Sequence, residues 1–329
     1  MPKVFISTSP FGALCDSPLK LLHEFGLEVV QNPLGRRMKP GELAEYIGDA
    51  DYLVAGTEQI DSEVLDSASN LKLIARVGIG LDGVDLLECK KRSILVSYTP
   101  DAPSPAVAEL AVGSAVSLMR GIHLADRGLR NGNWNRLFGY RIGGSVVGII
   151  GYGRIGKRVK ILLESFGPRK ILVCDKADSA FDLSDESIER VDRDYLLCNS
   201  DLVTLHLPLA PDTRHFLNSE SLKLMKRGSF LVNTSRGGIV DERTLIELLR
   251  EGHLRGAAID VFEDEPYFGD LREVANTIVT CHMGSMSMDC RRQMEIEAAR
   301  EVVEFHLHNK QNQAVPESEY LMRAGSNGL

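Results

Sequence analysis

The sequence is poor in the features that mark several classes of protein. It has only six cysteines in 329 residues, at positions 15, 89, 174, 198, 281 and 290, and none of them forms a C-x-x-C pair. No cluster of cysteine and histidine has the spacing of a metal site. Scattered single thiols are typical of a reducing compartment, so we expect neither structural disulfides nor a bound metal.

Features that direct a chain to a membrane or to a polyanion are also scarce. The longest apolar runs cover a few residues, far short of the ~20 that span a bilayer. A strand pattern starts at Val4, with no charged stretch and apolar segment before it, so no signal peptide is expected. Lys and Arg number 38 against 46 Asp and Glu, and the net charge of −8 disfavours nucleic acid and anionic membranes. These absences predict a cytoplasmic protein.

Glycine is the one residue type in excess. The chain has 30 glycines, which is about 9 % of its residues against a usual share near 7 %. At roughly 150 residues per domain, the length suggests about two domains. The positions of the glycines therefore matter for where these domains bind their ligands.

Short apolar segments alternate with helical patterns along most of the chain. Before residue 100, strands are predicted at 4–8, 28–31, 52–55, 71–77 and 95–98, with helical patterns between them. A second series has strands at 146–150, 170–174, 202–206, 230–233, 257–262 and 277–280. Alternation of this kind predicts an α/β fold with doubly wound parallel sheets.

Two stretches interrupt this alternation. Three prolines at positions 100, 103 and 105 predict a domain boundary, and we expect the next helix to begin after them, over 106–120. A further helix is predicted from 288 to about 309. Residues 310–329 lack periodicity and are expected to form a tail.

The hexamer from Gly151 to Gly156 fits the pattern G-x-G-x-x-G. It follows a predicted strand and precedes a predicted helix, which is the context of a dinucleotide site. Gly151 permits the tight turn, Gly153 allows pyrophosphate to approach the backbone, and Gly156 allows the helix to pack on the strand. The N–H groups of Arg154 and Ile155 would then face the phosphates at a positive helix end.

An acidic residue ends the next strand at the position where a ribose is bound in such sites. Asp175 lies 19 residues after Gly156, and its carboxylate would accept hydrogen bonds from the adenosine ribose hydroxyls. Its charge would repel a 2′-phosphate, which favours NAD over NADP, although the neighbouring Lys176 softens that preference.

Polar residues follow three successive later strands. Arg236 follows the strand at 230–233, an acidic stretch at 263–265 follows the next strand, and His282 follows the strand at 277–280. Ligands of open parallel sheets bind beyond the carboxyl ends of the strands. We therefore expect an arginine, a carboxylate and a histidine to converge near the nicotinamide.

These motifs together resemble the D-isomer-specific 2-hydroxyacid dehydrogenase family, over roughly residues 45–310. The resemblance rests on motifs that occur in the family's order, which in this sequence are Arg76-Val77-Gly78-Ile79-Gly80, Ala106-Val107-Ala108-Glu109-Leu110, Leu205-His206-Leu207-Pro208-Leu209, Asn233-Thr234-Ser235-Arg236-Gly237, and Gly256-Ala257-Ala258-Ile259-Asp260-Val261-Phe262 with Glu265-Pro266. It implies a flavodoxin-like substrate domain of residues 1–100 plus 288–329. An NAD-binding Rossmann domain of residues 101–287 would be inserted into it, with the active site in a cleft between the two.

The resemblance also assigns catalytic roles to the three polar strand-end residues. Arg236 would hold the substrate carboxylate with its planar fork and polarise the reacting carbonyl. His282 would be the general acid–base, and Glu265 would orient its ring. Hydride would pass between C2 of the substrate and the nicotinamide.

Further residues of the family's cofactor and substrate sites have counterparts in this chain. The implied cofactor contacts, besides the glycine motif and Asp175, are His206, Pro208, Thr234, Ser235, Arg236, Asp260, His282 and Gly284. A core histidine remains the alternative for His206, and a strand-end hydrogen-bond acceptor the alternative for Asp260. The implied substrate contacts are Arg76, Val77, Gly78 and Arg236, and the N–H groups of Gly78 and Gly80 would donate to the carboxylate.

Arg76 resembles an arginine of the phosphoglycerate dehydrogenases, so the short forms of that enzyme are the favoured relatives. A glyoxylate or hydroxypyruvate reductase is the alternative within the class, and an NAD-sensing protein of the corepressor type is the alternative outside it. The resemblance also implies a homodimer formed through residues 104–140, with Arg136 reaching the partner's cleft. One departure is Cys281, which stands where the family usually has proline.

Overall fold

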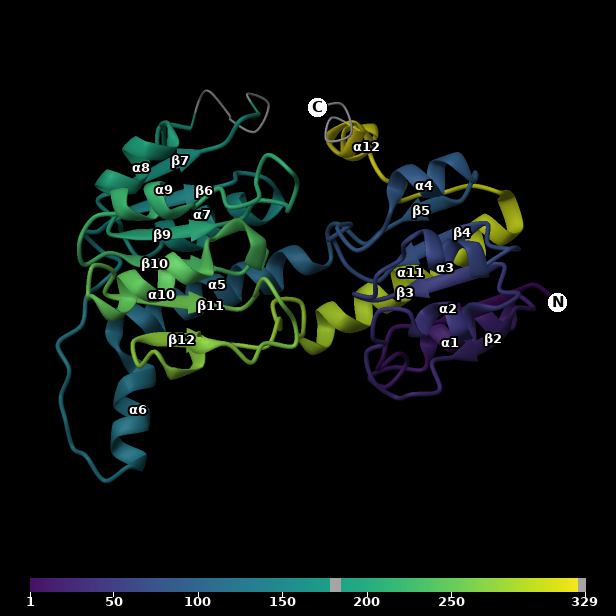
Figure 1. Cartoon of the computed structure of the whole chain (residues 1–329), viewed down its shortest axis with the longest axis horizontal. Coiled ribbons are helices and arrows are strands. Elements are labelled where there is room, and N and C mark those ends of the chain that lie inside the picture. Colours follow the sequence, from purple (N-terminus) through teal and green to yellow (C-terminus); the bar gives the residue numbers. More distant parts are fainter. Residues whose placement is uncertain (178–184, 325–329) are drawn as a thin grey trace. The chain divides into compact units, whose positions relative to one another are not determined.

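The computed structural model describes residues 1–177 and 185–324 and divides the chain into two units. The first unit consists of residues 1–103 and 285–329, and the second of residues 104–284. Each unit is built on its own parallel sheet with helices on both faces (Figure 1). The α/β fold class predicted from the alternating pattern is therefore confirmed.

The sheet of the first unit has five strands in the order β2-β1-β3-β4-β5. Its strands are β1 (Lys3–Ile6), β2 (Glu28–Gln31), β3 (Tyr52–Ala55), β4 (Leu73–Arg76) and β5 (Leu95–Ser97). The connecting helices are α1 (Ser17–Glu24), α2 (Glu42–Ile47), α3 (Ser62–Ser67) and α4 (Leu86–Lys91). The long C-terminal helix α11 (Met288–His308) packs on α1, β3 and β4, which returns the end of the chain to the first unit.

Part of the expected C-terminal tail is ordered, so that expectation was wrong for these residues. Helix α12 (Glu317–Ala324) packs on α4, and residues 325–329 lie outside the described part of the chain. Val315 is buried in the core of the first unit and Tyr320 packs against the same core. Two anchoring residues so close together are too few to produce a detectable periodicity, which is why the sequence pattern did not reveal this helix.

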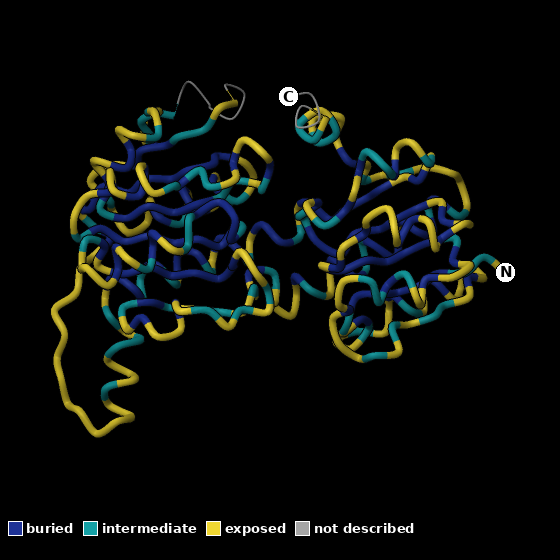
Figure 2. Tube along the Cα trace, viewed as in Figure 1, coloured by how far each residue is buried: buried dark blue, intermediate teal, exposed yellow. Residues whose placement is uncertain are grey.

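The sheet of the second unit has seven strands in the order β12-β11-β10-β9-β6-β7-β8. They are β6 (Val146–Ile150), β7 (Lys170–Cys174), β8 (Glu189–Arg190), β9 (Leu202–Leu205), β10 (Phe230–Asn233), β11 (Gly256–Ile259) and β12 (Thr277–Val279). The main helices are α5 (Pro103–Arg120), α6 (Ile122–Arg130), α7 (Arg154–Glu164), α8 (Arg193–Asn199), α9 (Ser219–Leu224) and α10 (Glu242–Arg250). Strands β6, β9, β10 and β11 are buried along their whole length, as expected for a sheet that is covered on both faces (Figure 2).

Helix α5 begins at Pro103, earlier than the predicted start at 106. Proline is tolerated in the first turn of a helix, because the N–H group that it lacks has no intrahelical partner there. Pro103 and Pro105 therefore start the helix rather than delay it. Of the described helices, none alone is long and apolar enough to cross a membrane; only the bent pair of α5 and α6, 63° apart, meets that length and composition together.

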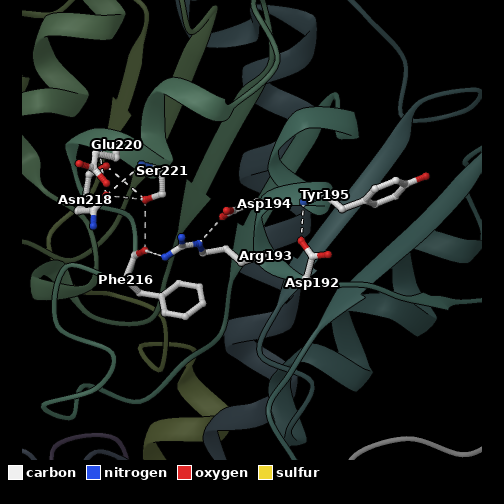
Figure 3. A network of polar contacts seen from close by, with 8 residues as sticks. All are labelled: Asp192, Arg193, Asp194, Tyr195, Phe216, Asn218, Glu220 and Ser221. Carbon is white, nitrogen blue, oxygen red and sulfur yellow. Dashed lines mark hydrogen bonds and ion pairs between the residues drawn. The ribbon is translucent and has the colours of Figure 1, made fainter.

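Side-chain caps set the starts of helices in the second unit, as α8 and α9 show. Asp192 accepts from the N–H of Tyr195 at the start of α8, and Asn218 accepts from the N–H groups of Glu220 and Ser221 at the start of α9 (Figure 3). Arg193 donates to the carbonyl oxygen of Phe216 and links the two caps. Each such cap contributes about 1 kcal/mol to helix stability.

Candidate active site

The three predicted catalytic residues follow three neighbouring strands. Strands β10, β11 and β12 are adjacent and parallel, with Asn233 paired to Ile259 and Ile259 paired to Val279. Arg236 follows the first of these strands, Glu265 the second and His282 the third. All three segments therefore leave the sheet at the same edge.

Glu265 and His282 are in direct contact. Nδ1 of the His282 ring lies 2.8 Å from Oε2 of Glu265, and a carboxylate can only accept from a ring N–H. The other oxygen, Oε1, accepts from the backbone N–H of Phe262 at 3.2 Å. Because Nδ1 is held in this way, Nε2 is the ring nitrogen that remains for proton exchange with a substrate.

The turn that carries His282 is held by Asp260. His282 has a left-handed backbone with φ of 51°, and its N–H donates to the carbonyl oxygen of Asp260 at 2.7 Å. The buried Asp260 carboxylate accepts from the N–H groups of Met283 and Gly284 and from the hydroxyl of Thr280, over 2.6–3.0 Å. This is the strand-end acceptor role that the sequence left open as the alternative for Asp260.

A buried asparagine shapes the turn that carries Arg236. Oδ1 of Asn233 accepts from the N–H and the hydroxyl of Ser235, and Nδ2 donates to the carbonyl oxygen of Arg236 at 2.9 Å. Asn233 lies within one of the family motifs, but the motif alone predicted no role for it. Its signal was available, since asparagine at a strand end commonly bonds to the backbone two residues on.

The turns after β10 and β11 touch at Gly237. A side chain there would place its Cβ 1.9 Å from the carbonyl carbon of Phe262 and 2.4 Å from the backbone nitrogen of Glu263. Only glycine allows this approach, which brings the Arg236 turn against the segment that leads to Glu265. The structure therefore brings the arginine and the carboxylate of the predicted trio onto touching segments.

The glycine motif forms the turn expected of a phosphate site. Gly151 has φ of +90°, and a Cβ at Gly156 would lie 2.1 Å from the Gly151 carbonyl oxygen, so both positions require glycine. A Cβ at Gly153, in contrast, would meet no atom of the described residues within 4 Å. Helix α7 begins directly after it at Arg154, so the N–H groups of Arg154 and Ile155 lie at a positive helix end beside open space.

Asp175 lies next to this turn. Its Oδ2 accepts from the N–H of Tyr152 at 2.6 Å and its Oδ1 from the N–H of Ala177 at 2.8 Å. Each carboxylate oxygen has a second lone pair for a ribose hydroxyl. The neighbouring Lys176 is paired with Asp212 at 2.7 Å.

Two buried polar atoms just after the carboxyl ends of β9 and β10 have no hydrogen-bond partner within residues 1–177 and 185–324. They are Nδ1 of His206 and Oγ1 of Thr234. Nε2 of His206 lies 2.9 Å from the hydroxyl of Thr204, and burial lowers the pKa of His206 to about 3, so its ring is neutral. Unpaired buried polar groups are costly, and a polar ligand such as a dinucleotide would satisfy them. The residues of this unit therefore fit NAD, with Pro208 exposed in the loop after β9.

The predicted substrate residues of the first unit follow β4. The Arg76 side chain is buried, and its Nη1 donates to the carbonyl oxygen of Val77 at 2.6 Å. The N–H of Gly78 donates to Oγ1 of Thr99, and the N–H of Val77 to the carbonyl oxygen of Ala55. Contrary to the expectation for Gly78, its N–H group is thus used inside the protein, which leaves Gly80 as the other glycine of the predicted cradle.

No group of three histidine, cysteine or carboxylate residues within 1–177 and 185–324 is arranged to hold a metal ion. The six cysteines are all free thiols, and Cys281, next to His282, is exposed.

Comparison with known proteins identifies the family. Residues 112–284 match the model of the D-isomer specific 2-hydroxyacid dehydrogenase NAD binding domain. The chain is 34 % identical to a glyoxylate reductase of Thermococcus litoralis (92 % of this chain, 93 % of that protein) and 37 % identical to a hydroxypyruvate reductase of Thermotoga maritima (86 % and 92 %). It is also 37 % identical to a D-3-phosphoglycerate dehydrogenase of Methanocaldococcus jannaschii, over 85 % of this chain but 53 % of that protein.

Solved structures agree with this assignment. The TT0316 protein of Thermus thermophilus superposes with a TM-score of 0.86 at 31 % identity, over 95 % of this chain and 100 % of that one. A D-lactate dehydrogenase of Aquifex aeolicus, solved with NAD and lactic acid, has a TM-score of 0.80 at 26 % identity, over 93 % of this chain and 95 % of that one. The prediction that short phosphoglycerate dehydrogenases are the favoured relatives is supported only in part, because this chain matches the reductases over nearly their whole length.

Proposed function

The chain belongs to the D-isomer specific 2-hydroxyacid dehydrogenase family, and we propose that it reduces glyoxylate or hydroxypyruvate with NADH. It is an NAD-dependent oxidoreductase that acts on small 2-hydroxy and 2-oxo acids. The observation that carries the proposal is the 2.8 Å contact between His282 and Glu265, on turns next to the one that carries Arg236.

In the reduction, His282 donates the proton that the carbonyl oxygen of the substrate takes up, and in the oxidation it accepts the hydroxyl proton. Glu265 holds Nδ1 of the ring, so that Nε2 faces the reacting oxygen, and it stabilises the imidazolium when the ring is protonated. The guanidinium of Arg236 binds the substrate carboxylate and polarises the adjacent carbonyl. NAD(H), when bound, supplies or accepts the hydride.

The cofactor is assigned to the second unit. The backbone at Gly153, Arg154 and Ile155 would bind the pyrophosphate, Asp175 the adenosine ribose, and the unpaired polar atoms of His206 and Thr234 the remainder of the dinucleotide. Ser235, Asp260 and Gly284 support this surface through the backbone turns described above. The first unit would supply Arg76 and the backbone near Gly80 to the substrate.

The two candidate substrate classes differ in whether the acid carries a phosphate group. The names of the curated relatives favour unphosphorylated 2-oxo acids. Oxidation of 3-phosphoglycerate is the second candidate, because Arg76 places a buried cation at the end of β4 and a buried cation suits a phosphate.

We further propose a homodimer formed through residues 104–140, in the cytoplasm. Helix α6 and the segment that follows it extend away from the sheet of their own unit (Figure 1). Trp134 is 79 % exposed and Phe138 is fully exposed, and such apolar clusters mark interaction surfaces. Arg136, on the same segment, is exposed and would reach the site of the partner.

The test is NADH consumption by the purified chain with glyoxylate, hydroxypyruvate, pyruvate and phosphohydroxypyruvate. We expect the highest kcat/KM with glyoxylate or hydroxypyruvate. His282→Ala should lower kcat by about 10² to 10⁴-fold while NADH binding stays within about twofold. Turnover confined to the phosphorylated acid would favour the second candidate. Binding of NADH without turnover of any 2-oxo acid would favour a corepressor-type sensor and overturn the proposal.

A further inference from the structure

The segment from Phe262 to Tyr267 fixes the direction of the Glu265 carboxylate. One carboxylate oxygen accepts from the N–H of Phe262, three residues earlier, and the other contacts His282. The carboxylate can meet the ring only while this short loop keeps its path. What holds the loop therefore matters for the proposed acid–base pair.

A second glutamate fastens the loop next to Glu265. Oε2 of Glu242, in the first turn of α10, accepts from the N–H of Glu263 at 3.0 Å. Tyr267 lines the same groove as Glu242, and the hydroxyl of Tyr267 accepts from the N–H of Leu271 at 3.1 Å. Burial raises the pKa of Tyr267, and the neighbouring Glu242 carboxylate raises it further. The Glu242 carboxylate thus binds the backbone two residues before Glu265 and neighbours the side chain two residues after it.

The ring of Tyr267 adds a packing contact to this arrangement. It stacks on the ring of Phe262 with centroids 4.0 Å apart and an interplanar angle of 14°. A Cβ at Gly269 would lie 2.5 Å from the Tyr267 hydroxyl oxygen, so glycine leaves room for it. Burial raises the pKa of Tyr267 to about 12, which keeps the hydroxyl protonated as a donor throughout the working range of an enzyme.

We propose that Glu242 and Tyr267 are positioning residues, which clamp the loop 263–267 so that the Glu265 carboxylate is aimed at Nδ1 of His282. Both residues line an open groove between α10 and the loop, together with Asp264, Pro266 and Phe268, so they hold the loop from its α10 side. The inference rests on the proposed roles of Glu265 and His282. It adds two residues that the sequence motifs did not mark.

The test compares variants that break the clamp with variants that spare it, in the full-length enzyme. Tyr267→Phe removes the hydroxyl but keeps the stacked ring, and Glu242→Ala removes the acceptor of the Glu263 N–H. Glu242→Gln keeps an acceptor oxygen and serves as the conservative rescue. Phe268→Ala is the matched control, because it lies on the same loop with a side chain that is 75 % exposed.

We expect Tyr267→Phe and Glu242→Ala to lower kcat about tenfold or more, since small misplacements of a catalytic group have large effects. The KM for NADH should stay within about twofold, and the pH profile of kcat/KM should move towards that of Glu265→Gln. Glu242→Gln should retain more activity than Glu242→Ala. In the Glu265→Gln background, Tyr267→Phe should have no further effect, because the two residues act through one carboxylate.

An equal loss from Tyr267→Phe in both backgrounds would overturn the clamp, and so would wild-type kcat and pH profile in both clamp variants. Failure of the proposed function looks different. In that case Glu265→Gln and His282→Ala themselves would keep wild-type activity.

Discussion

At the scale of single residues, the proposed site contains side chains with a role in the reaction and side chains that hold the turns. We assign Arg236, Glu265 and His282 to the first group, whereas the polar atoms of Asn233 and Asp260 bond to the turns that carry the arginine and the histidine. A sequence motif contains residues of both groups and does not distinguish them. The hydrogen-bond partners and the burial together tell them apart, because Asn233 and Asp260 are almost fully buried and bond to the turns around them, which is a structural task.

Asp175 is the residue on which we expect cofactor choice to depend. Asp175→Ala should lower kcat/KM for NADH by about ten- to a hundredfold, because hydrogen bonds to a charged group contribute about 1.5–3 kcal/mol. NADPH, whose phosphate the carboxylate repels, should lose little or gain. The measurement is the ratio of kcat/KM for the two cofactors. Lys176→Ala is the opposite control, since loss of the cation should disfavour NADPH; an unchanged ratio in Asp175→Ala would mean that the ribose contact is misassigned.

The cysteines should differ strongly in reactivity. Burial raises the pKa of the Cys89 thiol to about 12 and that of Cys290 to about 11, whereas Cys198 and Cys281 are exposed. A raised pKa leaves less thiolate at a given pH, and the thiolate is the species that reacts. Iodoacetamide at about pH 8 should therefore label Cys198 and Cys281 in the native protein and Cys89 and Cys290 only after unfolding, as peptide mass spectrometry can follow. Native labelling of Cys89 at the rate of Cys281 would contradict this.

At the scale of elements, the strand–turn–helix around Gly151 shows that glycines in one motif have different tasks. Gly156 makes room for backbone inside the protein, whereas Gly153 leaves space outside it. The sequence predicted both tasks from their place in the pattern. The distances now allow the two to be tested separately.

Gly156→Ala should destabilise the fold, because the added methyl group would overlap the carbonyl oxygen of Gly151. Overpacking of this kind costs about 1–3 kcal/mol, so Tm should fall by roughly 2 to 12 °C. Gly153→Ala should keep Tm within about 2 °C, because its Cβ meets nothing, yet raise the KM for NADH about tenfold or more by obstructing the pyrophosphate. Calorimetry and steady-state kinetics measure the two effects. The reverse pattern would mean that the phosphates bind elsewhere.

The elements also show where sequence reasoning reaches its limit. Strands and most helices followed from apolar periodicity, and the order of strand ends led to Arg236, His282 and the acidic stretch 263–265, within which the family resemblance selected Glu265. Contacts between elements did not follow, as the clamp by Glu242 and the helix α12 illustrate. Glu242 lies well before Glu265 in the chain, in a stretch that reads as an ordinary acidic first turn of a helix. Its partners are defined only when α10 and the loop after β11 pack together, and periodicity within one element carries no information about that packing.

At the scale of the whole molecule, the second unit is inserted into the sequence of the first. Helix α11 packs on α1 and β4, so residues from the two ends of the chain form one core. The inserted unit contains the trio and the glycine motif. It also carries α6 and the exposed segment after it, whose large apolar side chains are in contact with water in the single chain.

The proposed homodimer gives this segment a partner, and its test is the mass in solution. We expect the wild-type chain to have twice the chain mass by light scattering. An interface of standard size, about 1,600 Å², depends on apolar anchors, and the exposed Phe138 and Trp134 can supply them. Phe138→Asp should shift the protein towards the monomer, since burying an unpaired carboxylate is costly. Phe268→Asp places the same charge on a comparably exposed ring outside the segment and should leave the mass unchanged. A monomeric wild type, or a Phe138→Asp variant that stays dimeric at micromolar concentration, would place the interface elsewhere.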